Sequence, residues 1–130
     1  MANTITKTTL LDGARNLVQL INIVGDGSGE EANTVLVDRS AFAPTDGTSL
    51  SVDRIHGLLS GFTATLSFDA TADLIFCRLP DGDLIDHDWT CFGGVSSGKA
   101  GAGANGDILI STSSLGSGDS ATFILEMRKS

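Results

Sequence analysis

Alternation of apolar and polar side chains is the dominant pattern along this chain. From Phe62 to Phe68 every second residue is apolar, and threonine or serine fills the positions between. The segment from Ala121 to Arg128 repeats the pattern, with alanine, phenylalanine, leucine and methionine on one face. Successive side chains of a β-strand point to opposite faces, so both segments predict strands with one face in a core.

Seven further segments have strand character, and turns rich in glycine, aspartate, proline and serine separate them. The expected strands are residues 5–11, 16–24, 34–37, 51–59, 74–79, 84–89 and 108–112. The clearest turns are residues 25–29, 44–47, 80–82 and 116–119. Eight or nine short strands at roughly ten-residue spacing predict an all-β fold, an antiparallel β-sandwich that resembles a jelly roll.

Residues 16–24 allow a second interpretation. Leu10, Ala14, Leu17 and Ile21 also recur at helical spacing, and Asp12 would cap such a helix. We expect a strand here, because apolar residues occupy both of its faces and the run ends in a glycine-rich turn. That pattern predicts a strand buried on both sides.

The length and composition fit one domain. The chain has 130 residues, of which 41% are hydrophobic and 18% charged, which is enough apolar material for a core. We therefore expect a single β-sandwich domain over residues 1–130, in which the threonine-rich residues 1–9 form an N-terminal arm able to add a strand to a neighbour. We expect no membrane span and no secretion signal, since no long apolar run or basic leader occurs.

The charge excludes one class of partner. Acidic residues outnumber basic ones by 16 to 8, a net charge of −8, and the lysines and arginines are scattered. A surface of this sign repels phosphate backbones, so we expect no nucleic-acid partner.

The segment 93–107, GGVSSGKAGAGANGD, contains two nucleotide-binding patterns. Gly93, Gly98 and Lys99 fit G-x-x-x-x-G-K, and the glycines after them fit G-x-G-x-x-G. However, Ala100 stands where a magnesium ligand needs a hydroxyl, and the following glycines disfavour the helix that would bind phosphate. We expect a long mobile loop and no cofactor.

Two acidic segments are candidate cation sites. Residues 81–88, DGDLIDHD, would place Asp86 and Asp88 on one face of a strand and His87 on the other, which splits the ligands. Residues 26–31, DGSGEE, have oxygens at alternate positions. Neither segment matches a calcium loop, so a solvated acidic edge and a hairpin tip are the preferred interpretations, with a weak cation site as the alternative to each.

The remaining candidates are cysteine, histidine and tryptophan residues. Cys77 and Cys91 are expected as buried free thiols. Cys91 follows His87 by four residues, on the same face of an extended strand, but nothing orders a third catalytic partner. Trp89 with Phe92 would suit either a core or a sugar-stacking platform, and the core is preferred. We therefore expect no catalytic, cofactor-binding or metal-binding residues and no enzymatic activity.

Several segments resemble small virion structural proteins of tailed bacteriophages, cyanophages among them. They are residues 22–31, 35–38, 68–73, 106–112 and 123–129, and the resemblance spans residues 4–129. It implies a non-enzymatic structural role in a particle assembled in the host cytoplasm. Some small all-β phage proteins cement the capsid.

Placing the chain on the capsid goes beyond the resemblance: we hypothesise a decoration protein that binds the major capsid protein, or another virion protein, as a homotrimer or homodimer. The alternative hypothesis is a carbohydrate- or receptor-binding module in a neck, fibre or tail, with a site formed by Trp89, His87 and the loops 25–33 and 93–107.

Overall fold

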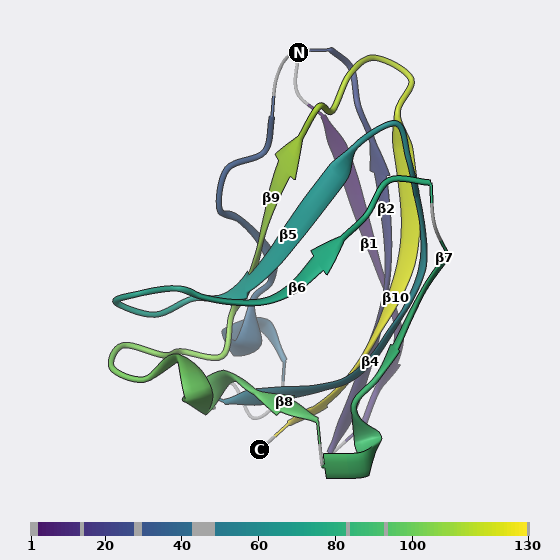
Figure 1. The fold of residues 1–130 in the computed structure, drawn as a ribbon. Coiled ribbons are helices and arrows are strands. Elements are labelled where there is room, and N and C mark those ends of the chain that lie inside the picture. The colour runs from purple at the N-terminus through teal and green to yellow at the C-terminus, as the bar shows by residue number, and fades with distance from the viewer. Residues whose placement is uncertain are drawn as a thin grey trace.

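Two antiparallel sheets pack face to face in the computed structural model, which describes residues 3–13, 15–27, 30–42, 49–82, 84–92 and 94–129 (Figure 1). The strands are β1 (Thr4–Asp12), β2 (Asn16–Val24), β3 (Thr34–Val37), β4 (Leu50–Ser60), β5 (Thr63–Phe68), β6 (Leu74–Leu79), β7 (Leu84–Asp88), β8 (Val95–Ser96), β9 (Ile108–Ser113) and β10 (Ser120–Lys129). Three 3₁₀ turns, η1 (Arg39–Ala41), η2 (Thr90–Phe92) and η3 (Ser97–Ala100), complete the elements. The fold class is the expected all-β sandwich.

The two sheets differ in width. The larger sheet has the strand order β1-β2-β10-β4-β7, with β8 pairing with β4, and the smaller sheet has the order β3-β9-β5-β6. Every strand pair is antiparallel. Because the larger sheet has more strands, β1 lies at an edge that the smaller sheet does not fully cover, and almost all of its residues are exposed.

The core lies between the sheets and comes from the alternating positions. Phe62, Ala64, Leu66 and Phe68 are buried, as the alternation predicts. On β10 the apolar face is likewise buried, while the residues between are half-buried or exposed. Strands β5 and β10 thus direct their period-two apolar faces inward, and hydrophobic burial holds the two sheets together.

Strand β2 departs from the expectation of burial on both faces. Leu17, Ile21 and Ile23 are fully buried, but Val18 and Leu20 on the opposite face are only half-buried. The reason is that the opposite face of the larger sheet has no third layer over it among the described residues. The apolar residues of that face therefore contact solvent.

Two further differences concern strand number and strand ends. The short strand β8 was not expected, and β7 ends at Asp88, one residue before the expected boundary. The expected turn at residues 44–47 lies outside the described residues. Among the residues described, no helix is long and apolar enough to cross a membrane.

Candidate functional site

The glycine-rich segment lacks the architecture of a phosphate-binding loop. Lys99 lies in η3, a four-residue 3₁₀ turn, and the chain then runs into strand β9 without an α-helix. Gly93 lies outside the described residues. Phosphate cradles use the N-terminus of a helix that follows the loop, and the described part of this segment provides none.

Instead, the glycine-rich segment packs against the β5–β6 turn. Thr71 N donates to Ala102 O at 3.0 Å, and Asp69 N donates to Asp107 O at 3.0 Å. Asn105 Nδ2 also donates to the Asp69 carboxylate at 3.1 Å. Figure 1 shows the two loops projecting side by side from the sandwich. The loop expected to be mobile is therefore tied to a neighbouring turn, and its small residues permit the close approach.

The acidic loop at residues 26–31 uses its carboxylates to fasten strands. Glu30 Oε1 accepts hydrogen bonds from Thr112 Oγ1 at 2.9 Å and from Leu115 N at 3.0 Å. The Glu31 carboxylate accepts from an asparagine amide and a threonine hydroxyl, at 2.9 and 3.0 Å. The oxygens of Glu30 and Glu31 already accept hydrogen bonds from backbone and side-chain donors of the protein. These carboxylates therefore satisfy neighbouring donors rather than form a cation site.

In the second acidic segment, residues 81–88, the aspartates also have protein partners. Asp86 accepts a bidentate pair of hydrogen bonds from Arg54, at 3.0 and 3.2 Å, and these bonds raise the pKa of the guanidinium. Asp88 accepts from Thr90 Oγ1 at 2.6 Å and from Thr90 N at 3.0 Å, which lowers the pKa of Asp88. Asp86 and Asp88 thus accept hydrogen bonds from two different residues, Arg54 and Thr90.

The described residues contain no group of three or more histidine, cysteine, aspartate or glutamate side chains placed to hold a metal ion. Residues 28, 29 and 83, which belong to the two acidic segments, lie outside the described part of the chain. The weak cation sites considered as alternatives stay without structural support.

Aromatic rings form a connected stack at the β6–β7 side of the sandwich. The His87 ring lies parallel to Trp89, with centroids 5.7 Å apart and an interplanar angle of 6°. Trp89 meets Phe76 edge-on at 6.2 Å, and Phe76 stacks on Phe68 at 4.2 Å. Trp89 therefore serves as a bridge from the core to His87, and a sugar ring would compete with His87 for the indole face.

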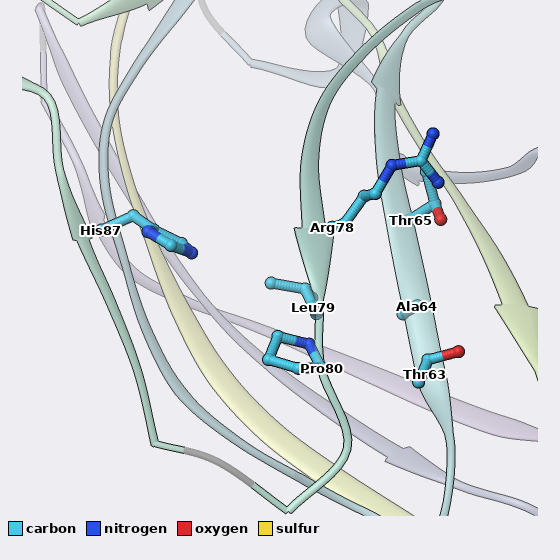
Figure 2. Close-up of a pocket in the computed structure, with 7 residues that line it drawn as sticks. All are labelled: Thr63, Ala64, Thr65, Arg78, Leu79, Pro80 and His87. Carbon is cyan, nitrogen blue, oxygen red and sulfur yellow. The ribbon is translucent and has the colours of Figure 1, made fainter.

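A hollow of about 440 Å³ adjoins this stack (Figure 2). Figure 2 shows His87 extending from β7 toward Leu79 and Pro80, while the Arg78 guanidinium lies beside Thr65. The hollow offers one guanidinium, one imidazole and threonine hydroxyls, but no carboxylate or thiol. In Figure 2 the threonine side chains lie on the far side of the hollow from His87, so this arrangement does not place a hydroxyl beside the imidazole.

The two cysteines differ in environment. Cys77 is buried as expected, and burial raises the pKa of its thiol to about 11. Cys91 is exposed, so the expectation that it is buried was wrong. Because β7 ends at Asp88 and η2 turns the chain, Cys91 does not continue the strand face of His87. The geometry assumed for a Cys–His pair is therefore absent.

An apolar stripe crosses the outer face of the larger sheet, and sequence analysis did not identify it as a surface. It consists of Val18 and Leu20 of β2, Ile124 of β10 and Leu58 of β4. Leu20 stands directly opposite Ile124, and Leu58 on the next strand stands opposite Thr122, two pairs further along and diagonal to Ile124. Leu58 is 46% exposed. The signal in the sequence was the second apolar face of residues 16–24, which was attributed to burial within the chain.

Ion pairs border the apolar stripe. Arg54 pairs with Asp86 at 3.0 Å, and Arg128 pairs with an aspartate at 2.9 Å. His56 Nε2 also lies 3.3 Å from a Glu126 carboxylate oxygen, a contact that becomes an ion pair when the imidazole is protonated. A hollow of about 330 Å³ extends from Val18 toward Arg54. The outer face thus combines an apolar centre with a rim of paired charges, which is the usual composition of a protein–protein contact surface.

Comparisons with known proteins identify no family. No protein-family model and no curated protein matches this sequence. One solved structure is similar in part, the crystal structure of Peruvianin-I, a cysteine peptidase from Thevetia peruviana latex, with 14% sequence identity and a TM-score of 0.40. The match covers 98% of this chain and 62% of the peptidase chain. Similarity at this level indicates neither a shared fold nor a shared activity.

Proposed function

We propose that this chain is a non-enzymatic structural protein of a tailed-bacteriophage particle, and that it acts as a capsid decoration protein. It assembles in the host cytoplasm, binds the lattice of the major capsid protein and stabilises the head. The observation that carries the proposal is the apolar stripe on the outer face of the larger sheet. The resemblance over residues 4–129 to phage virion proteins supplies the class of partner.

The apolar stripe is unusual for a sheet face in contact with solvent. Antiparallel sheets commonly present polar side chains on that face, whereas here Leu20 stands opposite Ile124, with Val18 two residues away on β2 and Leu58 diagonal to Ile124 on β4. Contiguous exposed apolar patches mark interaction surfaces more often than isolated apolar residues do. We infer that a partner surface covers the stripe in the assembled particle.

Each contact of this kind is weak by itself. Complete burial of a leucine side chain contributes about 2 kcal/mol, and these side chains are already partly buried in the isolated chain. A decoration protein tolerates such a weak contact when linked copies bind a repeating lattice, since the first contact raises the effective concentration for the next. The paired charges around the stripe favour one orientation on the partner.

Binding to phage heads that lack this protein tests the proposal. The wild-type protein should bind in saturable, near-stoichiometric amounts and raise the temperature at which the heads release DNA. Leu58→Glu should weaken binding at least tenfold, because it places a charge in the stripe. Ile75→Glu is the matched control, since Ile75 is 48% exposed but lies on β6 of the other sheet.

Two results would contradict the proposal. One is the absence of saturable binding by wild-type protein to such heads. The other is an equal loss of binding in Leu58→Glu and Ile75→Glu, which would show that the stripe has no special role. Circular dichroism of both variants establishes that each is folded.

The alternative hypothesis, a carbohydrate- or receptor-binding module, has less support. Its main candidate, Trp89, is half-buried and stacks against His87. A glycan array separates the two hypotheses: specific sugar binding that is lost in Trp89→Ala would favour the alternative.

A further inference from the structure

Strand β1 offers an unpaired edge for another strand. Its nine residues, Thr4–Asp12, pair with β2 on one side, and no described strand pairs with the other side. Ile5 is half-buried, and the remaining eight residues are exposed. A free edge of this length presents a row of N–H and C=O groups that another strand can bind.

Two features of β1 bear on how another strand could bind to this edge. Leu10 and Leu11 are 52% and 49% exposed, although they are adjacent and belong to a strand. A β-bulge at this point shifts the register between Thr9 and Leu11. The bulge changes which face the following residues occupy, and this change decides how two such strands can pair.

The register with β2 defines the face of each residue. Thr8 and Leu11 stand opposite Leu20 and Val18, so both point to the outer face of the sheet. By the same reasoning Lys7 and Asp12 stand opposite fully buried residues of β2, so both point to the inner side. When β1 pairs with an antiparallel copy of itself, Thr8 and Leu11 can therefore stand opposite each other on the outer face. Lys7 and Asp12 can do so on the inner face.

We propose that a second copy of this chain binds along β1, antiparallel, with Thr8 of each copy opposite Leu11 of the other. This register also places Lys7 of each copy opposite Asp12 of the other, which gives two inter-chain ion pairs related by the twofold axis. The exposed Leu10 and Leu11 of both copies gather near that axis. The two larger sheets then form one continuous sheet across the dimer.

Charge complementarity selects a second copy as the occupant. The whole chain carries a net charge of −8, so most of its surface repels another copy. Strand β1 carries one lysine and one aspartate, and the proposed register pairs each with its opposite in the other copy. Lys7 is exposed, and its Nζ donates to Val35 O at 3.1 Å, which leaves two of its three N–H donors for this contact. Asp12 remains available for this contact, because its side chain is 38% exposed even though one oxygen accepts from Lys129. The inference goes beyond the proposed function, since it concerns the isolated chain.

Disulfide trapping tests the register directly. In a Cys91→Ser background, which leaves only the buried Cys77, we would prepare Thr8→Cys and Leu11→Cys as separate proteins, one of them carrying a tag. Mixing them under mild oxidation should give at least five times more linked dimer than either variant alone. In the proposed register the two Thr8 positions are three residues apart, about 10 Å, which is too far for a disulfide.

A charge variant tests the proposal without a cross-link. Lys7→Glu should raise the dimer dissociation constant at least tenfold in sedimentation experiments, because it faces Asp12 of the other copy. Lys99→Glu, which makes the same charge change at an exposed residue of η3, should change it less than twofold. Both variants should keep the far-ultraviolet circular dichroism of the wild type.

Wild-type protein that is monomeric at about 100 µM would overturn the proposal. Preferential linkage of Thr8→Cys to itself would also overturn it, since that result requires another register. A monomer that still binds phage heads would refute the pairing while leaving the proposed function intact. A dimer that does not bind phage heads would refute the proposed function while leaving the pairing along β1 intact.

Discussion

Replacing Gly103 by alanine tests whether the glycine-rich loop exists for packing. Gly103 has φ +82° at the third position of a turn that the bond from Ala104 N to Gly101 O closes. A Cβ at this position would lie 2.4 Å from Thr71 Oγ1 and 2.8 Å from Thr71 N. The variant therefore has two penalties, one for the backbone conformation and one for the contact with the β5–β6 turn.

Gly118 provides a matched control for the first penalty. It has φ +84° at the same position of a turn closed by Asp119 N and Gly116 O, and a Cβ there would meet nothing within 4 Å. We expect Gly118→Ala to cost about 1 kcal/mol from the positive φ alone. Gly103→Ala should cost about 2 to 4 kcal/mol, because the overlap with Thr71 adds about 1 to 3 kcal/mol.

Urea unfolding at constant m-value measures both free energies of unfolding. Hydrogen exchange gives a local readout, because Thr71 N donates to Ala102 O across the two loops. Exchange of the Thr71 amide should accelerate in Gly103→Ala and stay unchanged in Gly118→Ala. If the two variants lose stability equally, within 0.5 kcal/mol, and Thr71 keeps its protection, the packing explanation is wrong.

Three further predictions concern individual polar or titratable side chains. Arg39→Met should lower the free energy of unfolding by about 2 to 4 kcal/mol in urea titrations, since the fully buried guanidinium donates to two backbone carbonyls at 2.9 Å. Burial raises the pKa of Asp107, so the folded state holds its proton to higher pH than the unfolded chain does, and this group lowers stability as pH rises from its ordinary value of 3.8 through the raised one. Asp107→Asn should therefore gain stability relative to wild type between pH 3 and pH 6, and a constant difference over that range would contradict the assignment. At pH 7.5 a thiol reagent should modify Cys91 quickly and Cys77 only on unfolding, and Cys91→Ser should abolish the fast reaction.

The candidate site shows where sequence analysis succeeded and where it stopped. The absence of a helix after Lys99 could be anticipated, because glycine content is a local property that lowers helix propensity. The attachment of that loop to Thr71 could not, since the two segments are about thirty residues apart and only the packed sheets bring them together. The exposure of Cys91 was missed for a related reason, because it depends on the residue at which β7 ends.

The sequence by itself determined the strands and their inward faces. Period-two alternation is a relation between neighbouring residues, and all nine expected strands occur, with the apolar faces of β5 and β10 in the core. Only the tertiary structure decided which apolar faces remain in contact with solvent. Val18 and Leu20 look like core residues along the chain, but burial depends on whether another layer lies over them, and among the described residues the smaller sheet packs only against the opposite face of the larger sheet.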